Sequence, residues 1–299
     1  MKRWTTIILT ATALLVSASA CGQGTPGAAK AASEAAERFW VTTPADSLLA
    51  EDILAELKDY LAGAPEKVTV AELMVRAGKA MEGQPYIAGT LDESPEELRI
   101  YLTRTDCIIF VETCLALART AKEGGDFRTF ANEVRQGRYR GGRIEAYADR
   151  LHYTTEWARQ GEARGVLQDM TRALGGEPLA RPINYMSAHP VSYPLMDDPA
   201  AIRAVEERIN SEPRYYIPKS KIAGALNGIR SGDIICLVSA VEGLDIAHVG
   251  LALAENGKVK LFHASTSTMK VTEDPRTLQE YLAGRSSILG IQVLRPLNQ

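Results

Sequence analysis

The sequence predicts an α+β fold, with a mainly helical part over residues 36–215 followed by an antiparallel β part over residues 216–299. Apolar residues recur at helical spacing through much of the first part, whereas the second part holds short β-rich runs. An Asn-Gly pair stands between two of these runs, which is typical of a tight β-hairpin. Helices first and strands later favour an α+β fold over alternating βαβ units.

The helical part contains one segment with particularly clear ends. Over residues 105–121, Thr105 or Asp106 can cap the N-terminus, and no Gly or Pro interrupts the run before Gly124. The remaining helices are predicted over residues 47–61, 70–81, 126–136, 146–159 and 197–210, with loops over residues 137–143 and 175–195.

The β part begins after Pro218 and ends near the C-terminus. Strands are predicted over residues 233–240, 247–255, 258–265 and 288–295, with a short helix over residues 276–283 before the last strand. Asn256-Gly257 favours a two-residue type I′ turn, so Glu255 should oppose Lys258 in a hairpin.

This hairpin register brings two histidines together. Counting back from the turn, His248 should oppose Ser265, and Gly250 should oppose His263. Opposed residues share a face of the sheet, as do residues two apart along one strand. His248 and His263 should therefore project from the same face, roughly 5–8 Å apart at Cβ.

A cysteine lies in the first turn of the 105–121 helix. It begins an apolar stripe with i, i+3, i+4, i+7 spacing, which comprises Cys107, Phe110, Val111, Cys114 and Ala118. We expect this stripe to pack on the histidine-bearing face of the hairpin, because Gly250, Ala252 and Ala254 leave room there for a helix. Cys107 would then meet His248.

These three side chains suit nucleophilic catalysis. The helix dipole and unpaired N–H groups at a helix start stabilise a thiolate, so Cys107 is the candidate nucleophile. His248 would be its general base, and His263 would orient the base. The backbone N–H of Cys107 would stabilise the oxyanion, and no cofactor is needed. A zinc site built from Cys107, His248 and His263 is the alternative, disfavoured because no fourth ligand is apparent.

The N-terminus resembles an export signal. Lys2 and Arg3 precede a short apolar run and small residues, so residues 1–20 are predicted to be a signal peptide of the lipoprotein type. Lipid on Cys21 would anchor the exported protein to a membrane of the cell envelope, with residues 21–35 as a flexible tether. Cleavage without lipidation is the alternative.

Composition argues against a nucleic-acid partner. The 299 residues include 34 Lys and Arg against 37 Asp and Glu, for a formal net charge of -3, and the sequence has no long run of one sign. Nucleic-acid-binding proteins usually carry a basic patch instead.

Several short motifs resemble the NlpC/P60 papain-like superfamily, and within it the DUF1460 family of N-acetylmuramoyl-L-alanine amidase-like proteins. They are Gln84-Pro85-Tyr86, Thr105-Asp106-Cys107, Tyr139-Arg140-Gly141-Gly142, Arg150-Leu151-His152-Tyr153, Ala247-His248-Val249-Gly250 and His263-Ala264-Ser265. The resemblance covers about residues 70–297. It implies a papain-like core, in which a catalytic helix packs on an antiparallel sheet or small barrel with extra helices, and one catalytic unit over residues 65–299.

The resemblance also implies an activity, namely hydrolysis of the amide that joins the lactyl group of N-acetylmuramic acid to L-alanine in peptidoglycan fragments. Cys107 matches the nucleophile, His248 the base and His263 the third member. Tyr86 matches a tyrosine that lines the site, and Asp106 is grouped with it as a substrate contact.

Arg150, His152 and Tyr153 are further candidates for substrate contact. Arginine can hold the carboxylates of a peptidoglycan stem in a bidentate way. The alternative is an amphipathic helix with a solvated arginine and aromatic core residues.

Two other functions stay open at this point. One is a γ-D-glutamyl–diamino-acid endopeptidase with the same three residues, and the other is a non-catalytic lipoprotein that binds the cell wall.

Overall fold

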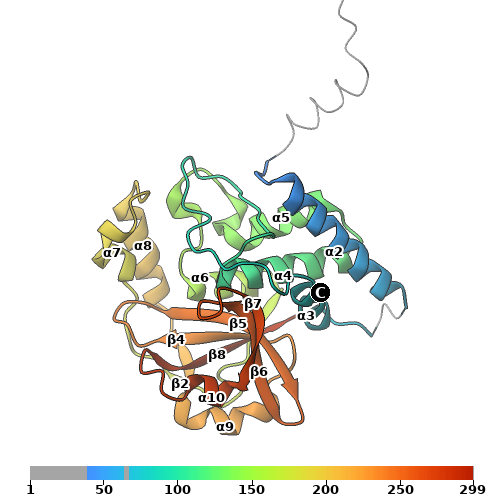
Figure 1. Ribbon diagram of the computed structural model, residues 1–299. Helices are drawn as coiled ribbons and strands as arrows, with labels where there is room; N and C mark the ends of the chain where they lie inside the picture. The colour runs from blue at the N-terminus through green and yellow to red at the C-terminus, as the bar shows by residue number, and fades with distance from the viewer. Residues whose placement is uncertain (1–38, 64–66, 299) are drawn as a thin grey trace, which may run out of the picture. The chain divides into compact units, whose positions relative to one another are not determined.

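The chain folds as helices followed by strands, as the sequence predicts. A computed structural model describes residues 39–63 and 67–298, and Trp40–Gln299 form one compact unit (Figure 1). The predicted signal peptide, Cys21 and the tether over residues 21–35 lie outside the described residues.

The α-helices of the described residues are spread over both halves of the chain. They are α2 (Pro44–Gly63), α3 (Val70–Ala80), α4 (Cys107–Lys122), α5 (Phe127–Arg138), α6 (Thr154–Ala163), α7 (Tyr185–Ala188), α8 (Pro199–Asn210), α9 (Ile222–Ala225) and α10 (Leu278–Leu282). No helix among these is long and apolar enough to cross a membrane, within the residues described.

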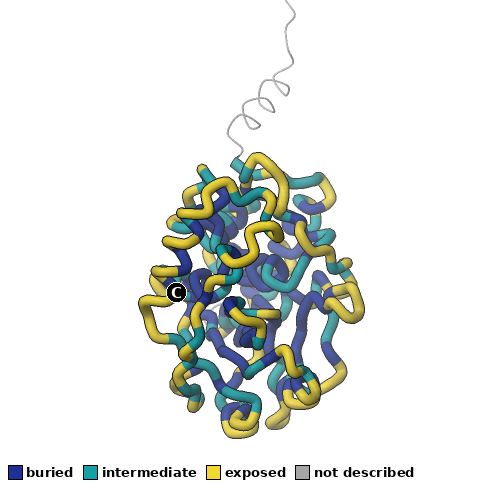
Figure 2. The backbone as a smooth tube through the Cα atoms, turned by 90° about the vertical axis from the view of Figure 1, so that its left-hand side faces the viewer, coloured by how far each residue is buried: buried dark blue, intermediate teal, exposed yellow. Residues whose placement is uncertain are grey.

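The strands form one antiparallel sheet in the order β2-β3-β8-β4-β5-β6-β7, with β1 paired to β8. Their bounds are β1 (Leu167–Asp169), β2 (Glu177–Pro178), β3 (Tyr215–Pro218), β4 (Ile234–Ser239), β5 (Ile246–Glu255), β6 (Lys258–Ser265), β7 (Lys270–Thr277) and β8 (Ile288–Pro296). Figure 2 shows the central strands as buried backbone and the turns that join them as exposed segments.

Strands β1, β2, β3 and β7 were not predicted. The first three are two to four residues long and lie within, or at the end of, the part predicted to be mainly helical. Strand β7 was missed because its sequence does not alternate apolar and polar residues. It carries Glu273, Asp274 and Pro275. Since β7 is the edge strand next to β6, a proline is tolerated there without loss of an inner ladder bond. The helix predicted over residues 146–159 is also shorter than expected and begins at Thr154.

The hairpin between β5 and β6 has the predicted register. Pairing runs from Glu255–Lys258 to Leu251–Phe262, and the turn residues Asn256 and Gly257 have φ values of 51° and 74°. The ladder ends at Leu251–Phe262, although β5 continues toward its start at Ile246.

The prediction for the packing of α4 was wrong. The Phe110 ring of α4 meets the Phe262 ring edge-on at 5.6 Å, so α4 covers the face with bulky side chains and not the face with the small residues. Helix α4 is buried along most of its surface, and large apolar partners fill the space around it better than glycine and alanine do.

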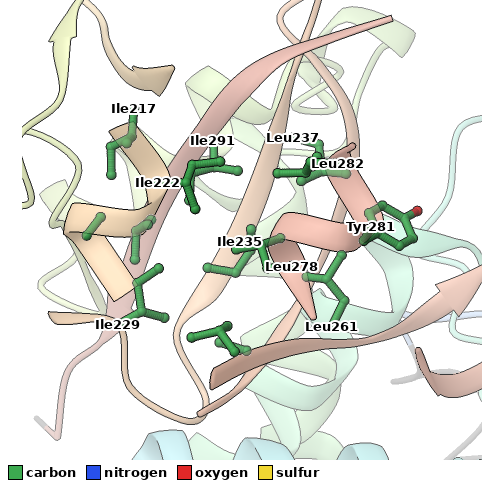
Figure 3. Packing of buried hydrophobic residues seen from close by; sticks show 14 of the residues in the cluster. Ile217, Ile222, Ile229, Ile235, Leu237, Leu261, Leu278, Tyr281, Leu282 and Ile291 are labelled. Carbon is green, nitrogen blue, oxygen red and sulfur yellow. The ribbon is translucent and has the colours of Figure 1, made fainter. Parts of the chain in front are cut away.

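The face with the small residues packs against α9 and α10 instead. Ala252 of β5 and Leu261 of β6 belong to an apolar cluster with Leu278, Tyr281 and Leu282 of α10 (Figure 3). Because His248 and His263 share this face, α10 lies on the histidine side of the sheet.

Candidate active site

The helix that carries Cys107 begins where the sequence predicts. Asp106 is the N-cap of α4: its backbone is extended and its carboxylate accepts the Ile109 N–H at 2.9 Å. Cys107 is the first residue of the helix, and its N–H donates no hydrogen bond within the described part of the chain. A free N–H thus lies beside the thiol, as at other helix starts.

Tyr86 lies next to this helix start. Its N–H donates to the Met269 carbonyl at 2.9 Å, and the following Ile87 N–H donates to the Thr105 carbonyl at 2.9 Å. Burial raises the pKa of Tyr86 to about 12, with smaller contributions from Cys107 and Asp106. These two backbone hydrogen bonds hold the Tyr86 side chain near the Cys107 thiol.

The two histidines contact each other directly. Nε2 of His248 and Nδ1 of His263 are 2.6 Å apart, and the rings meet edge-on with an interplanar angle of 81°. Both side chains are buried, with exposed fractions of 8% and 1%. At Gly250, a Cβ would lie 2.8 Å from the His263 Cβ, so glycine is what allows the second ring to approach.

The thiol of Cys107 lies against the start of β5. The Val249 N–H faces the sulfur, together with the N–H groups of Ile108 and Cys107 itself. If the hairpin pairing continued, Val249 would pair with Ala264, but the last pair of the ladder is Leu251–Phe262. The Val249 N–H is therefore available to the sulfur at the point where β5 and β6 separate.

Burial keeps the thiol and the imidazoles neutral. It raises the pKa of Cys107 to about 12, with a smaller rise from the Asp106 carboxylate. It lowers the pKa of His248 to about 3, helped by His263 and Arg285, and the pKa of His263 to about 4. Cys107 and His248 make no hydrogen bond with each other, so the thiol and the imidazole both rest uncharged.

Arg150 is already engaged by two carboxylates. Its guanidinium lies 3.3 Å from Asp92 Oδ1 and 3.4 Å from Glu96 Oε1, and the residue is 7% exposed. A substrate carboxylate at Arg150 would have to compete with Asp92. The substrate role of Arg150 stays a prediction.

His152 and Tyr153 are also engaged within the protein. Nε2 of His152 lies 2.8 Å from the Tyr147 carbonyl oxygen, and burial lowers the pKa of His152 to about 3. The Tyr153 hydroxyl donates to Glu206 at 2.7 Å and accepts the Met186 N–H at 2.9 Å. Their proposed contacts with substrate therefore also remain predictions.

Two residues near the histidines were not predicted from the sequence. The Tyr281 ring of α10 meets the His263 ring edge-on at 5.6 Å, and Arg285 donates to the Tyr281 carbonyl at 3.1 Å. No spacing in the sequence links α10 to the hairpin. Across residues 39–63 and 67–298, no three His, Cys, Asp or Glu side chains are arranged to hold a metal ion.

The fold and the site define an α+β protein with a cysteine at a helix start, against the N–H of Val249, and a pair of bonded histidines on neighbouring strands of an antiparallel sheet. Residues 76–290 match the family model AmiA-like, described as N-acetylmuramoyl-L-alanine amidase-like. The chain belongs to this family, as its resemblance predicted.

Solved structures agree with this assignment. An N-acetylmuramoyl-L-alanine amidase from Bacteroides uniformis is 35% identical, with a TM-score of 0.72, over 76% of this chain and 99% of that one. A Legionella pneumophila protein of the DUF1460 family is 20% identical, with a TM-score of 0.63, over 83% and 94% of the two chains, and it shares the fold. A comparison with curated proteins finds no match.

Proposed function

We propose that the protein is a cysteine amidase that hydrolyses the bond between N-acetylmuramic acid and L-alanine in peptidoglycan fragments. The observation that carries the proposal is the position of the Cys107 sulfur against the N–H of Val249. Val249 directly follows His248, which bonds His263 at 2.6 Å. Membership of an amidase-like family supports the choice of bond.

The first step is attack by sulfur. His248 uses Nε2 to bond His263, which leaves Nδ1 to take the thiol proton. The sulfur adds to the carbonyl carbon of the lactyl group, and the Cys107 N–H stabilises the negative oxygen that forms.

The second step releases the peptide. The C–N bond breaks as His248 returns the proton to the amino nitrogen of L-alanine, leaving a thioester on Cys107. His248 then takes a proton from water, which attacks the thioester and frees the sugar acid and the thiol. Because both imidazoles rest neutral, Nδ1 of His248 has a lone pair available to accept the thiol proton at the start of the cycle.

The mature protein is proposed to lie in the cell envelope, exported by residues 1–20 and held by lipid on Cys21. That location would place the enzyme beside its substrate. Mass spectrometry of the mature N-terminus tests this: a diacylglycerol-modified Cys21 supports the anchor, and an unmodified one refutes it.

Product analysis tests the activity. A muramyl tripeptide should yield the free sugar acid and an intact tripeptide, whereas a γ-D-glutamyl endopeptidase would release the diamino acid and leave the sugar on its peptide. Cys107→Ala should reduce turnover by about 10⁴-fold or more without loss of the fold. Cys114→Ala, a buried cysteine of the same helix, is the matched control and should retain activity. Activity of Cys107→Ala equal to that of the wild type would exclude the mechanism.

A further inference from the structure

The histidine pair has one buried nitrogen with no hydrogen-bond partner among the described residues. It is Nε2 of His263. The carboxylate of Asp274, on β7, lies near it, with Oδ2 3.9 Å from Nε2. Asp274 is itself only 4% exposed, so a buried carboxylate faces a buried ring nitrogen.

Asp274 is held firmly in place. Arg276 donates to Oδ1 through Nε at 2.9 Å and to Oδ2 through Nη2 at 2.8 Å, and its backbone N–H donates to Oδ1 at 3.0 Å. These bonds and Arg276 hold the pKa of Asp274 below its usual value, so the group is an anion at neutral pH.

The position of each proton in this chain of rings follows from hydrogen-bond rules. A base at Nδ1 of His248 requires its ring proton on Nε2, which then donates to Nδ1 of His263. His263 must accept at Nδ1 and, being neutral, must carry its own proton on Nε2. That N–H points toward the Asp274 carboxylate, whereas a lone pair there would be repelled by it.

We propose that Asp274 is a positioning residue: its carboxylate selects the tautomer of His263 with the proton on Nε2, and through it the tautomer of His248 with a free Nδ1. The distance of 3.9 Å between Nε2 of His263 and Oδ2 of Asp274 is too long for a hydrogen bond. The carboxylate therefore favours this tautomer by electrostatic attraction to the ring N–H. The other charges near His263 are Arg276 and Arg285, which both lower the pKa of His263 and so favour a neutral ring. The role of His248 as a base, and with it the effect on catalysis, rests on the proposed function, whereas the effect of the Asp274 carboxylate on the His263 tautomer does not.

The tautomers can be read without any enzymatic assay. The chain has four histidines, so ¹⁵N-histidine labelling gives four rings, and long-range ¹H–¹⁵N correlation spectra identify the protonated nitrogen of each. At pH 7 the wild type should show Nε2–H tautomers for both His248 and His263. An Nδ1–H tautomer at either ring would overturn the proposal, and this measurement needs no variant.

Asp274→Asn then tests the cause. It should give Nδ1–H or mixed tautomers at both rings, and it should slow alkylation of Cys107 by iodoacetamide. We expect kcat to fall about 10- to 100-fold at unchanged KM, the range for a residue that orients a catalytic group through a second one. The matched control is Asp233→Asn. Asp233 is 1% exposed and is also held by two bonds from one arginine, Arg295 (2.8 and 2.7 Å), yet contacts no histidine.

The two proposals can fail separately. Unchanged tautomers and alkylation in Asp274→Asn would refute the role of Asp274, whatever the substrate. Conversely, the expected spectra in a protein that leaves every muramyl peptide intact would refute the amidase while the role of Asp274 stands.

Discussion

Gly250→Ala should separate the two histidines while leaving the chain folded. An added Cβ would lie 2.8 Å from the His263 Cβ and 3.2 Å from the Phe262 carbonyl oxygen, against 3.4 Å for an ordinary contact. The β5 and β6 backbones must therefore separate by about 0.6 Å. The bond between His248 and His263 would lengthen from 2.6 Å to roughly 3.2 Å, at the weak end for hydrogen bonds.

The expected cost is larger for activity than for stability. Overpacking of this kind destabilises by about 1–3 kcal/mol. A misplacement approaching 1 Å in a catalytic group can cost about 10²-fold in rate. Gly250→Ala should thus lower kcat on a muramyl peptide by 10- to 100-fold, with a cooperative thermal transition retained.

A control glycine distinguishes a local effect from a general one. At Gly224 an added Cβ meets nothing within 4 Å, so Gly224→Ala should keep full activity and a stability equal to or above that of the wild type. If Gly250→Ala had wild-type kcat, close approach of the two rings would not be needed for the reaction.

Three further substitutions test the surroundings of the site, each by denaturant unfolding. Asp106→Ala removes the cap of α4 and should lower the free energy of unfolding by about 1 kcal/mol; no change would show that the cap is dispensable. Arg138→Met leaves the buried Glu112, bonded to it at 2.8 Å, without its cation, and should cost about 3–5 kcal/mol, much of which Glu112→Gln in the same chain should restore. His152→Gln addresses pH: folding lowers the pKa of His152 to about 3, so unfolded chains bind the extra proton and stability falls as pH drops from about 6.5 toward 3. The variant should flatten that fall by up to about 1.4 kcal/mol per pH unit, and an unchanged slope would contradict the burial of a neutral ring.

The histidine pair was predictable because a hairpin is a local structure. Two turn residues, Asn256 and Gly257, determine which residues oppose each other, and the side-chain period of two then determines the face. Every step depends on residues close in sequence. The same holds for Asp106, whose side chain caps the helix three residues later.

The face on which α4 packs was not predictable in this way. Gly250 and Ala252 leave space on their face, but the sequence does not say what fills it. In the structure the His263 side chain fills the space at Gly250, and the cluster that includes α10 fills the space at Ala252. Asp274 was missed for a related reason, because a polar edge strand with a proline has no apolar period to reveal it.

In the proposed mechanism a thiol on one side of the sheet must exchange a proton with an imidazole on the other side, and the end of the β5–β6 ladder lies between them. If the pairing continued, the Val249 N–H would bond Ala264, and no donor at the strand would face the Cys107 sulfur. Because the pairing ends at Leu251–Phe262, the Val249 N–H is free at the edge of β5, and this edge can be reached from both faces of the sheet. Gly250 meanwhile keeps His263 close enough for its Nδ1 to reach His248, and the edge-on angle of 81° points nitrogen at nitrogen, which stacked rings could not do. The site therefore depends on β5 and β6, whose backbone pairing ends before the histidines while the His248 and His263 side chains stay in contact.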